Sequence, residues 1–152
     1  MKRLKISIVF ILLLTTKVFS QADKVVGFWL TAEGDSQIEI SKMSNGCYSG
    51  KVAWMKNDQN AKDDKNPELK LKNRKIMGLQ ILSNFRFNEK DNEWVEGTIY
   101  DPKNGKSYDC YMWFEKDKNE LMIKGFVLGV RFLGRETSWK RENKLRLQIS
   151  NK

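Results

Sequence analysis

Residues 37–55 read QIEISKMSNGCYSGKVAWM, and this stretch decides the fold class. Apolar and polar residues alternate on both sides of Asn45-Gly46. A period of two is typical of a half-buried β-strand, and Asn-Gly between two such runs favours a type I′ hairpin turn. The stretch therefore predicts two antiparallel strands, at 37–42 and 48–55.

The same pattern of short alternating runs continues along the chain in both directions. It predicts further strands at 26–31, 76–87, 94–100, 107–115, 121–127 and 130–140. The connections are short, except for a polar loop at 56–74. Strands joined in chain order form a meander, and closing a meander into a barrel removes its two exposed edges. The predicted fold is all-β, an eight-stranded antiparallel up-and-down barrel; a flattened sandwich is the alternative.

The N-terminus has the layout of a signal peptide. A basic start is followed by an apolar run at 6–14 and by Val18-Phe19-Ser20, which provides a cleavage site. The run is too short for a membrane span, which needs about 20 residues. We therefore expect cleavage after Ser20 and export to the periplasm or the medium; an uncleaved anchor is the alternative. The domains expected are a signal peptide at 1–20, a barrel at 21–142 and a charged tail at 143–152.

Composition narrows the classes of function. The chain has 28 Lys and Arg, 19 Asp and Glu and no His. The cations are spread along the chain without a basic helix, so we expect no nucleic-acid partner. Without histidine the chain cannot form a Ser-His-Asp or Cys-His catalytic site, and it lacks the commonest metal ligand. We expect neither a cofactor nor a metal site, and the sequence leaves the oligomeric state open.

The chain has two cysteines, Cys47 and Cys110. Two cysteines are too few for a disulfide scaffold, but an oxidising compartment permits a single bridge. The alternative is two separate buried thiols, because Cys110 falls on the apolar face of its predicted strand.

Two short segments, in the first and the last predicted strand, resemble the signature of calycins, the group that includes the lipocalins. These are Gly27-Phe28-Trp29 in the first strand and Trp139-Lys140-Arg141 in the last. The resemblance implies that Trp29 closes the barrel floor and that Arg141 covers its outer face. An arginine can stack on an indole ring while it donates hydrogen bonds to nearby carbonyls.

A second resemblance covers nearly the whole chain after residue 20. It is similar to the bacterial family called domain of unknown function 2147, which comprises small secreted proteins. The matching pieces, in order, are Gly27–Thr31, Gly50–Trp54, Lys65–Pro67, Gly78–Leu82, Trp94–Gly97, Ile99–Pro102, Asn104–Lys106, Gly125, Gly134–Arg135 and Trp139–Arg141. The resemblance implies a lipocalin-like barrel in the cell envelope, and it implies no activity.

The topology also predicts where a site would lie. In a meander, alternate connections emerge at the same end, so the long loop and the turn at 101–106 share one mouth with Glu33-Gly34-Asp35 and Gly129. Binding residues usually lie on such loops. The candidate ligand-binding residues are Trp54, Asp64, Asn66, Trp94, Tyr100, Asp101, Tyr108 and Arg135.

Less specific explanations exist for these residues. The aromatic side chains could fill the barrel instead of lining a cavity. Asp101 and its neighbours could serve turn formation alone, and Asp63, Asp64 and Asn66 could be solvated. The predicted function is binding of a small apolar or amphipathic ligand. The alternatives are an interaction module of the envelope surface and an enzyme using Tyr and Asp at the mouth, although nucleophile, phosphate-loop and dinucleotide motifs are absent.

Overall fold

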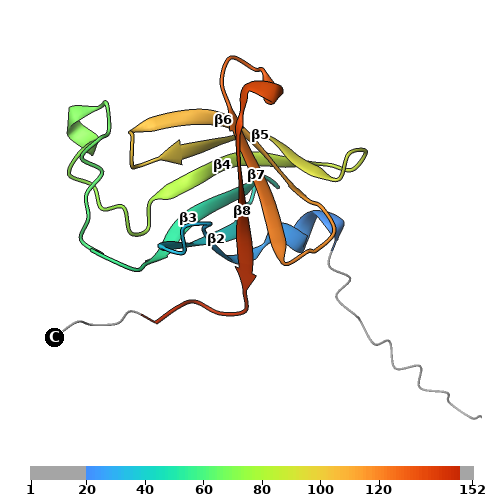
Figure 1. Ribbon diagram of the computed structural model, residues 1–152, viewed down its shortest axis with the longest axis horizontal. Coiled ribbons are helices and arrows are strands. Elements are labelled where there is room, and N and C mark those ends of the chain that lie inside the picture. The colour runs from blue at the N-terminus through green and yellow to red at the C-terminus, as the bar shows by residue number, and fades with distance from the viewer. Residues whose placement is uncertain (1–19, 148–152) are drawn as a thin grey trace, which may run out of the picture.

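The computed structural model describes residues 20–147, and these form one closed barrel of antiparallel strands in chain order (Figure 1). The strands are β1 (Gly27–Leu30), β2 (Ser36–Lys42), β3 (Tyr48–Met55), β4 (Gln80–Asn88), β5 (Glu93–Asp101), β6 (Lys106–Phe114), β7 (Glu120–Phe126) and β8 (Arg135–Glu142). Pairing of β1 with β8 closes the barrel. The predicted eight-stranded up-and-down barrel is confirmed, and a sandwich is excluded.

Three short 3-10 helices accompany the strands: η1 (Gln21–Val25), η2 (Leu69–Leu71) and η3 (Arg131–Leu133). None of the helices within residues 20–147 is long and apolar enough to cross a membrane. The predicted signal peptide, apart from Ser20, and residues 148–152 of the predicted tail lie outside the described residues.

The strand bounds differ from the prediction by more than two residues in two places. Residues 76–79 form a turn because Gly78 has a φ of 82°, so β4 starts at Gln80. Residues 130–134 hold η3 instead of the start of β8. In both places an apolar run was mistaken for a strand, since periodicity alone cannot tell a short strand from a turn packed on the barrel.

The turn between β2 and β3 also differs from the predicted type I′ turn. Gly46 has a φ of 81°, whereas Asn45 is not among the residues with positive φ. The Met43 amide donates to the Cys47 carbonyl at 2.7 Å and the Gly46 amide to the Met43 carbonyl at 2.9 Å. This is a three-residue loop that ends in a left-handed glycine, the next commonest hairpin connection.

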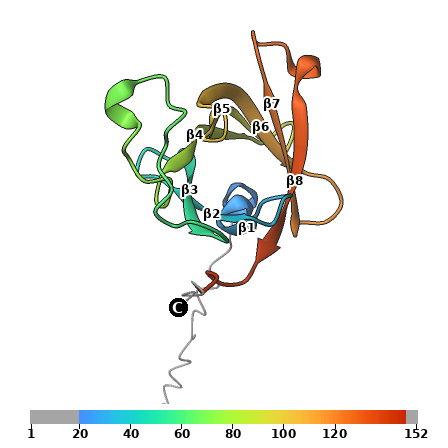
Figure 2. The ribbon, with the colours of Figure 1, turned by 60° about the vertical axis from the view of Figure 1, so that its left-hand side comes forward.

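The helix η1 closes one end of the barrel; Figure 2 looks into the barrel from the other end and shows η1 behind the opening. Two fully buried indoles hold it there. Trp29 Nε1 donates to the Val25 carbonyl at 2.8 Å, and Trp94 Nε1 donates to the Ala22 carbonyl at 3.0 Å. Phe114 packs against both rings, at centroid distances of 5.9 Å and 5.2 Å. This end is therefore a packed floor.

Arg141 covers Trp29 from outside, as the calycin resemblance implies. Its guanidinium carbon lies 4.1 Å from the centroid of the indole. The same group donates to the carbonyls of Val26 at 3.1 Å, Lys118 at 3.3 Å and Lys24. The arginine thus ties η1, β1 and the β6–β7 turn to the last strand.

We expect Arg141→Ala to lower the free energy of unfolding by about 2 kcal/mol, because it removes the stack and leaves carbonyls without a donor. Lys140→Ala is the control, since Lys140 is exposed on the other face of β8. Urea unfolding at pH 7 measures both. Equal losses in the two variants would contradict the stacking role.

The two cysteines are free and buried, so the possible disulfide is not formed. Cys47 precedes β3 and Cys110 lies within β6, and β4 and β5 lie between these strands in the barrel. Adjacent strands are about 4.8 Å apart, which places the two residues well beyond the roughly 5.5–6 Å between the Cα atoms of a disulfide. Burial raises the pKa of the Cys110 thiol to about 12.

Candidate functional site

A cavity of about 1230 Å³ occupies the barrel at the end opposite η1. Its inner wall consists of apolar side chains from six strands: Ile38, Val52, Ile81, Ile99, Ile123 and Trp139. Small-molecule pockets usually measure about 300–1000 Å³, so this one is large enough for a fatty-acid-sized molecule. Side chains thus fill the floor of the barrel and leave its other half hollow.

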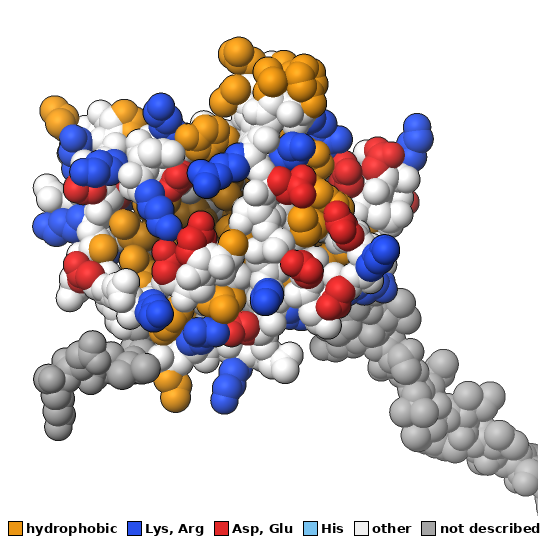
Figure 3. All heavy atoms as spheres, in the orientation of Figure 1, with side chains coloured by type: hydrophobic (Ala, Val, Ile, Leu, Met, Phe, Trp, Pro, Cys, Tyr) orange, Lys and Arg blue, Asp and Glu red, His pale blue; other side chains and the backbone are white. Residues whose placement is uncertain are grey.

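The mouth of the cavity is polar. Its rim comes from the four connections β1–β2, β3–β4, β5–β6 and β7–β8, which the sequence predicts to share one end. Figure 2 looks toward this end, and Figure 3 shows hydrophobic side chains recessed beside β8 with charged side chains around them. The rim carries cations (Lys62, Lys65, Lys103, Arg135) and anions (Glu33, Asp35, Asp58, Asp64, Asp101, Glu136).

One ion pair links two of these connections. Lys103 of the β5–β6 turn donates to Asp35 of the β1–β2 turn at 3.0 Å. In an eight-stranded barrel these hairpins stand on opposite sides. The hydrogen bond to Asp35 raises the pKa of Lys103 above its ordinary value. The pair therefore narrows the mouth while both groups stay charged.

The long β3–β4 connection is held against the barrel by a buried carboxylate. Asp63 is fully buried and accepts from the Tyr100 hydroxyl at 2.6 Å, from Asn66 Nδ2 at 2.8 Å and from Arg74 Nε at 2.8 Å. Tyr100 belongs to β5, so the loop is fixed to a strand that lines the cavity.

The charge state of Asp63 follows from these contacts. Burial alone would raise the pKa of Asp63, but hydrogen bonds from Tyr100, Asn66 and Arg74 outweigh it and hold the pKa below its ordinary value. The carboxylate is therefore ionised at neutral pH and satisfied by the protein itself. Asp63 does not line the cavity, so it lacks the position of a catalytic acid facing a ligand.

A glycine gives the same loop a second anchor. Gly105 has a φ of 72°, and a Cβ there would lie 2.0 Å from the carbonyl oxygen of Lys65. The β3–β4 loop thus packs directly on the backbone of the β5–β6 turn. The loop forms part of the rim and does not fill the cavity.

Five of the eight candidate residues line the cavity: Asp64, Tyr100, Asp101, Tyr108 and Arg135. Asp101 is occupied with its own turn, where it accepts from the Lys103 amide at 2.9 Å and from Asn104 Nδ2 at 2.8 Å. Tyr108 lies beside it and accepts from Asn104 Nδ2 at 3.0 Å. Arg135 and Lys62 form no ion pair within residues 20–147, so these two cavity-lining cations are available to a ligand.

The other three candidates do not line the cavity. Trp94 belongs to the floor, and Asn66 is buried in the Asp63 cluster. Trp54 faces outward because β3 has a bulge: Gln37 pairs with Trp54 while Ile38 pairs with Val52, which leaves Ala53 as an extra residue.

The outward face of Trp54 is covered by the chain that follows β8. Trp54 Nε1 donates to the Leu147 carbonyl at 3.2 Å, and Arg146 lies over the ring at 5.0 Å. Gln37, which is fully buried, donates to Glu142 at 2.7 Å and to the Lys144 carbonyl at 2.9 Å. Lys144, Arg146 and Leu147 of the predicted tail therefore contact the barrel.

Sequence reasoning missed much of the apolar wall. Ile38 and Val52 lie in the two alternating runs of residues 37–55, but only aromatic side chains were predicted as a possible lining. Trp139 was predicted as part of the calycin signature and not as a lining residue, yet it is 4% exposed and lines the cavity. Its alternation with Arg135 and Thr137 along β8 was the signal that could have found it.

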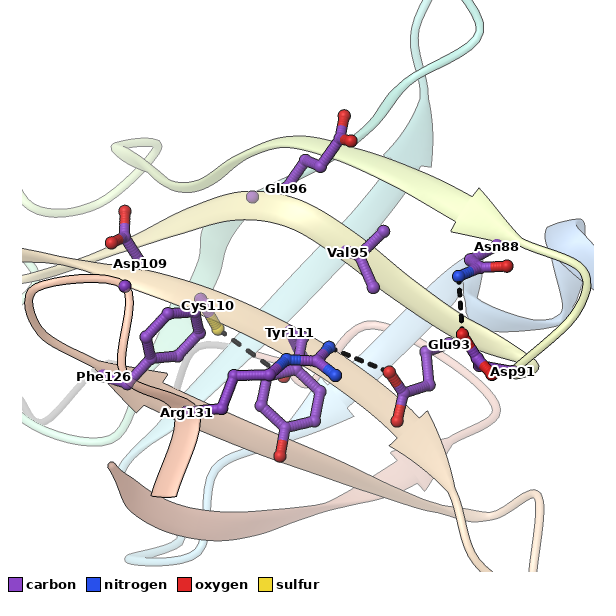
Figure 4. Close-up of a pocket in the computed structure, with 12 residues that line it drawn as sticks. Asn88, Asp91, Glu93, Val95, Glu96, Asp109, Cys110, Tyr111, Phe126 and Arg131 are labelled. Atoms are coloured by element: carbon purple, nitrogen blue, oxygen red, sulfur yellow. Dashed lines mark hydrogen bonds and ion pairs between the residues drawn. The ribbon is translucent and has the colours of Figure 1, made fainter. Parts of the chain in front are cut away.

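A smaller hollow of about 470 Å³ lies on the outside of the barrel. Figure 4 shows Arg131 extending over Tyr111 toward Glu93. The guanidinium is 3.7 Å from the ring centroid of Tyr111 and 2.8 Å from the carboxylate of Glu93. These contacts hold η3 on the outer face of β5 and β6, and Arg131 lines the hollow.

Comparisons with known proteins agree with the barrel. A family model described as "Uncharacterized protein conserved in bacteria (DUF2147)" matches residues 27–141. The solved structure of protein HP1028 from Helicobacter pylori, described as belonging to the lipocalin family, is similar with a TM-score of 0.65 and 23% identity. The match covers 77% of this chain and 82% of that one, and at this identity it shows the fold alone. No curated protein matches this chain.

Proposed function

The chain belongs to the bacterial family DUF2147, and because its barrel is lipocalin-like and hollow we propose that it binds one small amphipathic molecule. The observation that carries the proposal is the cavity of about 1230 Å³ with an apolar wall and a polar mouth. An apolar wall stabilises a hydrocarbon chain by about 25 cal/mol for each Å² removed from water. A polar mouth keeps a headgroup hydrated at the same time.

The charge expected on the headgroup of the ligand follows from Arg135. This exposed cation lines the mouth and, like Lys62, is not neutralised by an ion pair within the described residues, whereas Lys103 and Lys65 pair with Asp35 and Asp64. An anionic headgroup at Arg135 would gain a charge-assisted hydrogen bond. We therefore propose a carboxylate- or phosphate-bearing ligand with a single apolar chain.

The proposal is tested by displacement of a fluorescent probe, anilinonaphthalene sulfonate, by lauric acid, a lysophospholipid and decanol. Saturable displacement by all three is expected, with Kd values in the micromolar range for the first two. Arg135→Gln should weaken the two anionic or zwitterionic ligands and leave decanol unchanged. A wild-type protein that binds none of the three would contradict the function.

A steric variant separates cavity binding from surface binding. Thr137 lines the cavity opposite Ile123, so Thr137→Trp is expected to fill the space and weaken binding about tenfold or more. The control is Ser138→Trp, because Ser138 pairs with Met122 on the outer face of the same strand. Equal affinities in the two variants would place the ligand outside the barrel.

We also propose that the protein works after export, in the periplasm or outside the cell, because residues 1–20 have the layout of a signal peptide. The floor contacts of Ala22 and Val25 would survive cleavage after Ser20. Intact mass of the exported protein should correspond to a chain starting at Gln21, or its cyclised form. A mass that retains Met1 would contradict export.

A further inference from the structure

The β7–β8 connection exposes an apolar surface. Four of the eight exposed large hydrophobic side chains among residues 20–147 lie within its eight residues 127–134. We call these four the apolar tip: Val127, Leu128, Phe132 and Leu133. Leu128 is 90% exposed and Phe132 80% exposed. In Figure 3 hydrophobic side chains project at the top of the molecule, where Figure 1 shows this connection.

The apolar tip is continuous with the cavity. Val127 and Leu133 are partly exposed at the tip and also line the cavity. A fifth exposed side chain, Leu69 in η2, is 80% exposed on the other large connection at the same end. Figure 2 shows η2 and η3 on either side of the barrel opening. The mouth thus has apolar projections on two of its sides.

Charge distinguishes the two ends of the barrel. The four connections at the mouth together carry nine Lys and Arg and six Asp and Glu. Their residues are 31–35, 56–79, 102–105 and 127–134. Three connections lie at the closed end, and together they carry three Lys and four Asp or Glu. Their residues are 43–47, 89–92 and 115–119. The excess positive charge at the mouth is concentrated next to the exposed Leu69, because residues 69–75 contain four cations and no acidic residue. Arg74 pairs with Asp63 and Lys70 with Glu68, whereas Lys72 and Lys75 form no ion pair within residues 20–147.

We propose that the mouth of the barrel docks on an anionic phospholipid bilayer, with the apolar tip inserted among the headgroups. Exposed leucine and phenylalanine next to lysine and arginine is the chemistry of peripheral membrane binding, where apolar insertion adds to attraction by anionic lipids. This inference rests on the proposed function, since it specifies where the amphipathic ligand is exchanged. A single-chain lipid leaving the bilayer would pass along Val127 and Leu133 into the cavity without crossing water.

The test is co-sedimentation of the full chain, without its signal peptide, with vesicles. One set contains equal parts of phosphatidylglycerol and phosphatidylcholine, and the other contains phosphatidylcholine alone. We expect binding to the first set, weaker binding in 0.5 M NaCl, and at least about tenfold weaker partitioning of the double variant Leu128→Ser/Phe132→Ser. The control is Met43→Ser, because Met43 is an exposed apolar side chain in a turn at the closed end.

Three results would overturn the docking: no binding of the wild type to anionic vesicles, undiminished binding of the double variant, or a wild-type dimer that the double variant converts to a monomer. The last would assign the apolar tip to a second copy of the chain. Uptake of lauric acid is measured in parallel and should be unchanged in the double variant. If vesicle binding depends on the apolar tip but the protein takes up no lauric acid, the docking is supported and the ligand-binding function is refuted.

Discussion

Replacing Asp63 with alanine is expected to lower the free energy of unfolding by about 3 kcal/mol. The carboxylate is fully buried, and its removal leaves the Tyr100 hydroxyl and Arg74 without their shared partner. Breaking a buried ion pair costs about 3–5 kcal/mol, and we take the lower figure because Arg74 is about one third exposed.

The control for this substitution is the next residue. Asp64→Ala removes an exposed carboxylate whose ion pair is with the exposed Lys65, and such pairs contribute about 0–1 kcal/mol. Urea unfolding at pH 7 compares the two variants. Similar losses would show that the cluster around Asp63 does not anchor the loop.

The same carboxylate gives stability a dependence on pH. Because the folded-state pKa of Asp63 is below its ordinary value, its contribution is present above the unfolded pKa of about 4 and is lost as the pH falls through the folded pKa. The free energy of unfolding of the wild type should therefore fall more steeply between pH 4 and pH 2 than that of Asp63→Asn. Parallel pH profiles would contradict the assigned charge state.

Gly97→Ala is expected to destabilise the barrel by about 3 kcal/mol or to prevent folding. A Cβ at Gly97 would lie 2.4 Å from Cδ1 of Phe85. Phe85 is fully buried, so its ring cannot move aside without disturbing the core. Overpacking typically costs about 1–3 kcal/mol, and a contact this short falls at the upper end of the range or beyond.

Gly125→Ala is the matched control for Gly97→Ala. Both glycines pair with Cys110, one from β5 and the other from β7. At Gly125 a Cβ would meet nothing closer than 3.4 Å, which is ordinary contact. Thermal unfolding followed by circular dichroism should show a much lower Tm for Gly97→Ala alone. Equal shifts would mean that the Phe85 ring is not packed on Gly97.

The strand order could be predicted from alternation, because each strand buries one face. The bounds of β3 agree with the prediction at both ends, and the open end follows from the meander. The direction of Trp54 could not be predicted, since a single extra residue at Ala53 reverses the face of everything after it. Such a bulge does not change the alternation of apolar and polar residues that precede it, so the alternation cannot reveal the bulge.

The floor of the barrel was beyond sequence reasoning for a different reason. Residues 21–25 are too few to show a helical period. The sequence therefore did not indicate that η1 would close one end of the barrel, or that Trp94 would bind η1 there instead of lining the cavity. The Asp63 cluster was missed because it joins groups 37 residues apart in the chain, Asp63 and Tyr100. Arg141 and Trp29, which are further apart still, were paired only through the calycin resemblance.

Native mass spectrometry of the protein after incubation with a bacterial lipid extract is the most direct test of ligand binding in the cavity. For the wild type and for Ser138→Trp we expect one dominant adduct, a single amphipathic molecule per chain, that survives removal of excess lipid. For Thr137→Trp, whose side chain would occupy the cavity, the adduct should be lost while the circular dichroism spectrum stays that of a β-barrel. An adduct of equal intensity in both variants, or no adduct on the wild type, would contradict a ligand-binding cavity.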